Sequence, residues 1–287
     1  MGVGKEIKGL KNVKFIFFVL ISIIFIFPTL TSAESITNNN GIVITEEEYN
    51  NFLKIYSSDY IMHMTEEKYN QLKEFDFNNI VTETKYVEVM YNQSLNLTTE
   101  KEITEEEYNN HNSVMRSIDG AASHETQAKR IVLSVIGGSI WNHVTFTATW
   151  KGIPSNRSYD VIGIRGFGLE FRDGSQVGDQ VYIQDGNYTT IDYAWNGTNI
   201  KKFDNGFGIS MNIVNPDITF LQLIVDCDVK ETIEYPVVFG SYQHAQQNLS
   251  LADSQNYTLG GSGLGSVFVY PYSIAQKYDG MSGIYVD

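Results

Sequence analysis

The sequence predicts a mainly β protein: an antiparallel β-sandwich, or a barrel, preceded by a short acidic α-helical segment. Three observations lead to this prediction. After residue 129, apolar and polar residues alternate with the two-residue period of strands. Pairs of turn-forming residues separate these stretches at short intervals, as in sandwiches. Repeated strings that favour helix starts occur before residue 112.

The first 33 residues have the features of a secretory signal peptide. Four lysines lie within residues 5–14, an apolar run of 13 residues covers 15–27, and small residues that suit cleavage end at Ala33. A membrane-spanning helix needs about 20 apolar residues, so an uncleaved anchor is the less favoured alternative. Cleavage after Ala33 gives a secreted, extracellular chain of 254 residues that begins at Glu34.

The mature chain is strongly acidic. The full sequence has a net charge of −14, and removal of the four leader lysines and Glu6 makes the charge −17. Such a chain repels phosphate backbones and anionic membrane surfaces unless its cations are concentrated, and no basic cluster is larger than a Lys-Arg or Lys-Lys pair. We therefore expect no nucleic-acid partner. No second apolar stretch is long enough to span a membrane.

The charge also divides the mature chain. Residues 34–128 carry a net charge of −12, whereas residues 129–287 carry −5. We therefore expect an acidic helical segment with TEEEYNN-type repeats at 34–112, a polar linker at 113–128 and an antiparallel β domain at 129–287.

One sequence string occurs three times, and each copy is suited to start a helix. ITEEEYNN at 44–51 returns at 103–110, and MTEEKYNQ at 64–71 is a weaker copy. In the two full copies the Thr can cap a helix while the Glu three residues later binds back to the cap, which is a capping box. The middle copy has Lys68 in place of that Glu. The copies at 44 and 64 are expected to start a helical hairpin and the third to form only a turn; a docking role for the acidic face is the less favoured alternative.

Two stretches of the β domain show the clearest alternation. Residues 140–150 and 221–229 each place apolar side chains on one face, which predicts strands with one buried face. The single cysteine, Cys227, shares the apolar face of the second stretch, so we expect a buried structural thiol and no internal disulfide. Asn196-Gly197 is the strongest hairpin prediction because both residues accept positive φ.

No motif specifies a catalytic, metal or cofactor site. Asp226 and Asp228 flank Cys227 on the opposite strand face, where we expect them to be solvated, because two carboxylates are too few for calcium. The glycine-rich stretch 260–266 lacks the Lys-Ser/Thr ending of a phosphate loop. The histidines show no metal spacing, and no nucleophile or orienting acid is recognisable beside His244. We therefore expect no cofactor and name no catalytic or metal-binding residue.

Aromatic residues are the candidate binding residues. Alternate residues of VFVYPYS at 267–273 are predicted to face opposite ways, with Tyr270 and Tyr272 on one side, so that one face can meet the core and the other a ligand. Burial of both faces is the favoured alternative. Trp141 lies on the polar side of its strand and is a weaker candidate. Tyr and Trp suit sugars or partner loops because they give a large contact area at low entropic cost.

Several stretches carry a resemblance to known sequences. ITEEEYNNFLKIYSSDYIMHMTEEKYNQL, RSYDVIGIR, FGISMNIV, GSYQHAQQNLSLADS and KYDGMSGI resemble a group of uncharacterised exported proteins of low-GC Gram-positive bacteria. The resemblance implies a helical TEEEYNN segment before a β-rich domain. It implies no activity and no site residue.

These observations favour a non-catalytic extracellular module that binds polysaccharide or protein. The alternative is a secreted polysaccharide hydrolase, because a pair of carboxylates about 5 to 10 Å apart can be assembled from distant strands. A membrane-active toxin is less favoured, because charges and turns interrupt the candidate strands too often.

Cleavage of the leader is directly testable. We expect mass spectrometry of the protein recovered from the culture medium to show an N-terminus at Glu34, because the small residues that suit cleavage end at Ala33. A start far from Glu34, or retention in the membrane fraction, would contradict this prediction.

Overall fold

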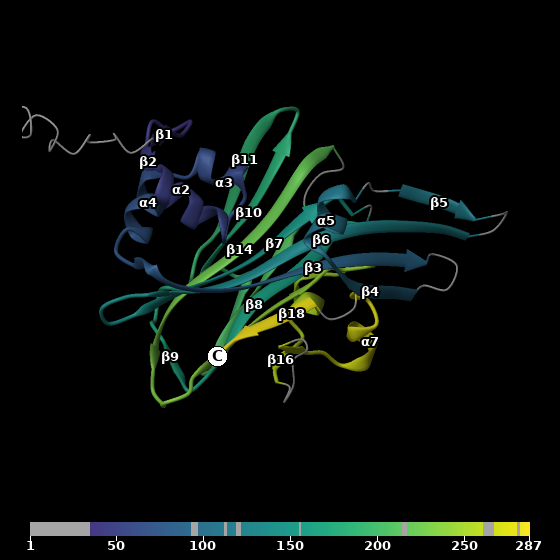
Figure 1. The fold of residues 1–287 in the computed structure, drawn as a ribbon. Coiled ribbons are helices and arrows are strands. Elements are labelled where there is room, and N and C mark those ends of the chain that lie inside the picture. The colour runs from purple at the N-terminus through teal and green to yellow at the C-terminus, as the bar shows by residue number, and fades with distance from the viewer. Residues whose placement is uncertain are drawn as a thin grey trace, which may run out of the picture.

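The computed structural model describes residues 35–92, 97–111, 114–118, 122–154, 156–213, 217–260, 267–279 and 282–287, and the predicted signal peptide lies outside them. In these residues the protein is mainly β, with antiparallel sheets and short helices near the N-terminal region, as predicted. Two sheets pack face to face as a sandwich (Figure 1).

The larger sheet contains the longest strands of the protein. Its order is β11-β10-β14-β7-β6-β3-β4, with β5 beside β6 and β9 beside β14, and all pairings are antiparallel. The strands are β3 (Asp76–Asn92), β4 (Leu97–Ile103), β5 (Val114–Ile118), β6 (Ala122–Gly137), β7 (Asn142–Lys151), β9 (Leu169–Phe171), β10 (Val177–Gln184), β11 (Asn187–Tyr193) and β14 (Ile218–Glu231).

The smaller sheet has the order β12-β13-β8-β15-β18 and is also antiparallel. Its strands are β8 (Tyr159–Phe167), β12 (Ile200–Phe203), β13 (Gly206–Asn212), β15 (Val237–Gln243) and β18 (Ser282–Val286). Two short ladders complete the strands: β1 (Ser35–Thr37) with β2 (Val43–Thr45), and β16 (Thr258–Leu259) with β17 (Phe268–Val269).

The main core lies between the two sheets. In β7 and β14 every second residue points inward, which gives the alternation that the sequence shows, and Phe146 and Leu223 are examples. Cys227 belongs to this core and is fully buried, as predicted. Burial is the main cause that raises the pKa of its thiol well above the usual range, and Asp226 and Asp228 add to the effect.

The outer face of the larger sheet is buried as well, which corrects the expectation of one buried face. Three helices, α2 (Glu46–Leu53), α3 (Ser58–His63) and α4 (Glu66–Leu72), pack on this face (Figure 1). They form a second core with Ile136, Val181 and Ile224 of the sheet. The polar residues of β7 on this face, such as Thr145 and Thr147, are therefore buried too.

The repeated string forms three helix starts. Thr45 with Glu48 and Thr104 with Glu107 both form the predicted capping boxes. The third copy is the short helix α5 (Glu105–Asn110) rather than only a turn. In the middle copy Thr65 caps α4, but Lys68 binds Asp226 of β14 through a 2.7 Å ion pair. The residue at which this copy departs from the repeat, Lys68, therefore contacts the sheet.

The acidic N-terminal part is less helical than expected. Residues 76–103 form β3 and β4, which are strands of the larger sheet, and residues 114–118 and 122–128 lie in β5 and β6 rather than in a linker. The long β3 pairs with β6 across this region. The charge difference therefore does not coincide with a change from helix to strand.

The position of the tight hairpin differs from the prediction. Asn196-Gly197 connects β11 to β12, which belong to different sheets. The hairpin with two positive φ angles is Asp185-Gly186, at 52° and 77°, between β10 and β11. Both sequences permit this turn, and the pairing of the flanking strands decides which one adopts it.

The C-terminal segment covers the outer face of the smaller sheet. It includes α6 (Leu251–Ser254) and α7 (Tyr272–Ala275), and it forms a third core with Val161 of β8. Tyr257 and Phe268 lie against Gly208 of β13, where a Cβ atom would approach them to within 2.4 and 2.7 Å. Glycine at this position therefore permits the close approach of the two rings.

The contact of Lys68 gives a mutational prediction. Lys68→Glu restores the full capping box of α4, yet we expect it to destabilise the protein by about 3 kcal/mol or more, because it leaves the buried Asp226 beside a second carboxylate. The free energy of unfolding, measured by chemical denaturation, checks this. Glu107→Lys removes a capping box on the exposed α5 and is the matched control, for which we expect only a small change. A stabilising Lys68→Glu would contradict the assignment.

Candidate functional site

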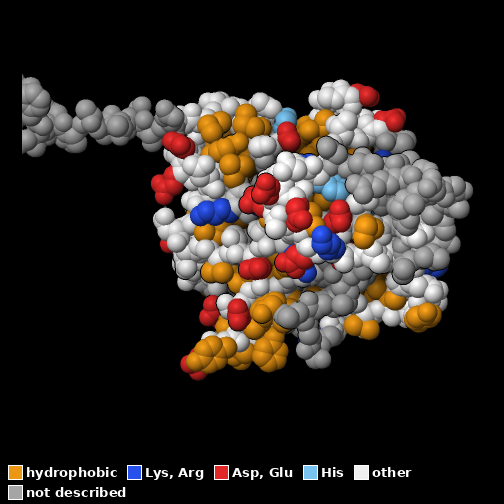
Figure 2. Space-filling view, turned by 45° about the vertical axis from the view of Figure 1, so that its right-hand side comes forward, with side chains coloured by type: hydrophobic (Ala, Val, Ile, Leu, Met, Phe, Trp, Pro, Cys, Tyr) orange, Lys and Arg blue, Asp and Glu red, His pale blue; other side chains and the backbone are white. Residues whose placement is uncertain are grey.

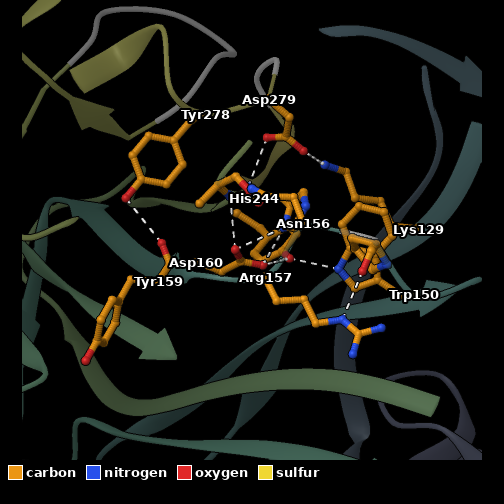
Figure 3. A network of polar contacts seen from close by, with 12 residues as sticks. Lys129, Trp150, Asn156, Arg157, Tyr159, Asp160, His244, Tyr278 and Asp279 are labelled. Carbon is orange, nitrogen blue, oxygen red and sulfur yellow. Dashed lines mark hydrogen bonds and ion pairs between the residues drawn. The ribbon is translucent and has the colours of Figure 1, made fainter. Parts of the chain in front are cut away.

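A buried network of polar side chains lies between the sheets around His244 (Figure 3). The Nδ1 of His244 is 2.9 Å from the Oδ2 of Asp160. The same carboxylate accepts hydrogen bonds from the Tyr242 hydroxyl and, at 3.0 Å, from the backbone N–H of Ala245. Trp150 donates from Nε1 to the Tyr242 hydroxyl at 2.8 Å. Asp160 is thus the centre of this half of the network.

Lys129 joins the network to the strand β4. Its Nζ lies 2.7 Å from both Asp279 and Glu100. Asp279 also accepts the backbone N–H of His244 at 3.0 Å. The ammonium lies 5.3 and 5.1 Å from the ring centres of Trp150 and Tyr242, within the range of cation–π attraction.

Burial and nearby charges shift the pKa values of these groups in opposite directions. Burial lowers the pKa of His244 and of Lys129, but their carboxylate partners outweigh it and both values are raised. Burial raises the pKa of Asp279 to about 7, although Lys129 acts to lower it. The network therefore holds its protons more tightly than the same groups hold them in water.

The network has the parts of a proton-transfer dyad but little space for a substrate. His244 is 2 % exposed. The cavity beside it has a volume of about 10 Å³, lined among others by Gln127, Asn156 and Gln246. A space of this size accommodates about one water molecule. The arrangement suits a structural role, in which the network fixes the C-terminal segment to the sandwich.

A second buried network joins the helices to the outer face of the larger sheet. Asp226 contacts Lys68 at 2.7 Å and the Nε2 of His143 at 3.4 Å, while the Nδ1 of His143 lies 2.9 Å from Asp228. Arg172 also contacts Asp228, at 3.2 Å. The expectation that both aspartates are solvated is wrong, because the helices cover this strand face.

The charges of this second network determine its pKa shifts. Burial acts to raise the pKa of Asp226, but Lys68 and His143 outweigh burial and the pKa lies well below its usual range. Burial acts to lower the pKa of His143, and its bonds to Asp226 and Asp228 raise it overall. The network holds α4 on the sheet.

An open cavity lies between the two sheets on the side of β3 and β18. Its volume is about 230 Å³. Aliphatic side chains from both sheets line it, among them Val81, Val135, Val229, Val238 and Val286, and polar residues at its edge include Asn79, Asn142, Glu231 and Asp287. A concave site that combines apolar walls with polar groups is suited to binding.

The cavity continues into a groove along β18. The groove has a volume of about 310 Å³ and shares Asp287 with the cavity. One wall is formed by Gly283, Ile284 and Tyr285 of β18, and the other by residues of β3 and β4 that include Glu83, Lys85 and Glu102. We call the cavity and the groove together the open side of the sandwich.

Exposed hydrophobic side chains lie in the segments next to the cavity. Phe167 and Tyr235 are 60 % and 76 % exposed, and Ile233 is also exposed. They are near neighbours in sequence of Leu169 and Pro236, which line the cavity. Figure 2 shows hydrophobic side chains gathered at the lower end of the molecule, where Figure 1 places β9. Such patches commonly mark interaction sites.

The predicted binding residues lie elsewhere and apart. Trp141 is half-buried in the turn before β7. Tyr270 donates to the Ser254 carbonyl at 2.8 Å and packs against Tyr257, whereas Tyr272 begins α7 and is 84 % exposed. The predicted alternation at 267–273 fails because β17 ends at Val269 and Pro271 caps α7. None of the three lines the open side.

Within the described residues, no group of three or more His, Cys, Asp or Glu side chains is placed to hold a metal ion. No helix among them has the length and apolar character needed to cross a membrane. Comparison of the chain with models of protein families, with curated proteins and with solved structures gives no match.

The two buried histidines predict how stability depends on pH. Each has a raised pKa in the folded state, so its stabilising effect is complete below the unfolded value of about 6.5 and is lost as pH rises through the folded value. Asp279 acts in the same direction, because ionising it in the folded state costs stability between about pH 4 and 7. We therefore expect the free energy of unfolding to fall as pH rises above about 6.5, by at most about 1.4 kcal/mol per pH unit for each histidine.

Chemical denaturation at a series of pH values checks this dependence. His143→Gln and His244→Gln should each make it shallower, because each removes one titrating group. His63→Gln is the control, since the ring nitrogens of His63 contact Asn39 and the Asp59 carbonyl rather than a carboxylate. A stability that rises over this pH range would contradict the assignment.

Proposed function

We propose that the protein is an exported, non-catalytic binding protein that holds a partner protein on the open side of its sandwich. The observation that carries the proposal is the cavity of about 230 Å³, with aliphatic and polar walls, that stays open to solvent between two sheets whose other faces are covered. Export rests on the leader at residues 1–33.

The lining of the open side favours a protein partner over a polysaccharide. Sugars pack well on flat aromatic rings, but the apolar side chains that line the cavity are aliphatic, most of them valines. Aliphatic pockets suit the side chains of a partner protein, and exposed aromatic residues such as Phe167 and Tyr235 can then contact its surface.

The placement of the acidic groups favours binding over polysaccharide hydrolysis. A carboxyl group that acts as a general acid is usually enclosed by apolar groups that keep its proton. In the groove, the Glu102 side chain is 69 % exposed and pairs with Lys85 at 3.2 Å. The enclosed aspartates belong to the two buried networks: Asp160 and Asp279 lie beside His244, where there is no space for a sugar ring, and Asp226 and Asp228 lie under the helices in ion pairs.

A peptide selection tests the proposed site. A random-peptide phage library is selected on the immobilised mature protein, and the selected peptides are measured against Phe167→Ser and Tyr235→Ser. Both positions are exposed, so the changes should leave folding intact. We expect a loss of affinity of about tenfold or more for each, which is about 1.4 kcal/mol.

Tyr272→Ser is the matched control, because Tyr272 is another highly exposed tyrosine and was predicted from the sequence as a binding residue. It should leave binding unchanged. If Tyr272→Ser abolishes binding of the selected peptides but Tyr235→Ser does not, the aromatic C-terminal segment is the binding site instead. The protein could also release sugars from cell-wall polysaccharide. If Glu83→Gln or Glu102→Gln stops this release, the function is hydrolysis and the proposal of a binding protein is wrong.

A further inference from the structure

The strand β18 is an edge of the smaller sheet. It pairs with β15 over five residues without a break, from Tyr242↔Ser282 to Val238↔Val286. Among the described strands, none pairs with its other side. An edge strand presents a row of N–H and C=O groups that can pair with another chain.

The residues of β18 do not protect this edge. Proteins usually block an edge strand with lysines, prolines or bulges. The opposite edge of the same sheet, β12, carries Lys201 and Lys202, and the neighbouring edge of the larger sheet, β4, carries Lys101 and two glutamates. The sequence of β18 is SGIYV, which contains neither a charge nor a proline.

The open side provides space for one more strand beside β18. The inward face of β3 is only partly covered. Val87 and Val89 of this face are in the core, but Val81, on the same face by strand alternation, is 51 % exposed. The groove of about 310 Å³ lies between this uncovered face and β18.

The charge of the groove defines the partner. It is lined by three carboxylates, Glu83, Glu102 and Asp287, and by one cation, Lys85, which pairs with Glu102. In the part of the chain that the structure describes, Glu83 and Asp287 form no ion pair. The protein as a whole is acidic. A second copy would place carboxylates against carboxylates, whereas a basic segment would be attracted.

We propose that β18 accepts an extended, basic segment of a partner protein as a sixth strand of the smaller sheet. The side chains of the added strand alternate, so those that point toward β3 meet Val81 and the other valines of the cavity at one end and Glu83 and Glu102 at the other. The opposite side chains lie on the outer surface beside Tyr285. This inference rests on the proposed function and specifies how the open side binds.

A peptide in which lysine and valine alternate is the probe, and a peptide in which glutamate and valine alternate is its control. We expect the lysine peptide to bind the mature protein, with an affinity that falls as salt is added, and the glutamate peptide not to bind. Glu83→Lys with Glu102→Lys should weaken binding by about tenfold or more. Glu46→Lys with Glu47→Lys makes the same change of net charge on the surface of α2 and should have little effect.

Hydrogen exchange separates strand addition from attraction of charge alone. Strand addition requires slower exchange of the amides of β18 that point away from β15 when the lysine peptide is bound. Binding without this protection, or an equal effect of the two double variants, would overturn the proposal. So would dimerisation of the protein through β18, as measured by analytical ultracentrifugation.

The outcomes also distinguish this inference from the proposed function. If the lysine peptide fails to bind while phage-selected peptides still depend on Phe167 and Tyr235, the open side binds a partner in another way and strand addition is wrong. If no selected peptide depends on these residues, the proposed function fails first.

Discussion

The ion pair of Lys68 with Asp226 is the interaction on which the arrangement of the helices depends. The outer face of the larger sheet mixes apolar residues such as Ile224 with carboxylates, so covering it buries charge. Burying a carboxylate costs several kcal/mol unless a partner compensates it. Lys68 supplies that partner and His143 adds a second contact. The helices can therefore pack on this face in only a few positions, because the apolar and the charged contacts must both be satisfied.

The sequence predicts the local features of this protein well. The alternation in β7 and β14, the capping boxes at Thr45 and Thr104 and the buried Cys227 depend on residues close together in the chain. Lys68 even stood out as a departure from a repeat. The partner of Lys68 could not be predicted, because Asp226 lies 158 residues away and linear spacing carries no information about that contact.

The errors have a common physical origin. Asp226 was expected to be solvated, and Asn196-Gly197 to form a hairpin, because each prediction considered one strand without the layer or strand beside it. The candidate site was missed for the same reason. The valines of the cavity come from strands of both sheets, and no motif marks a valine that lines a cavity.

The two buried networks hold every layer of the protein except the open side, where we propose that a partner binds. The His244 network ties the C-terminal segment to the sandwich, and the Lys68 network ties the helices to the larger sheet. Each uses carboxylates that only a specific partner can satisfy, which fixes one arrangement of the chain. The side of β3 and β18 has no such network among the described residues. Its valines remain partly in water, and the proposed partner would gain free energy by covering them, provided that its cations pair with the carboxylates of the groove.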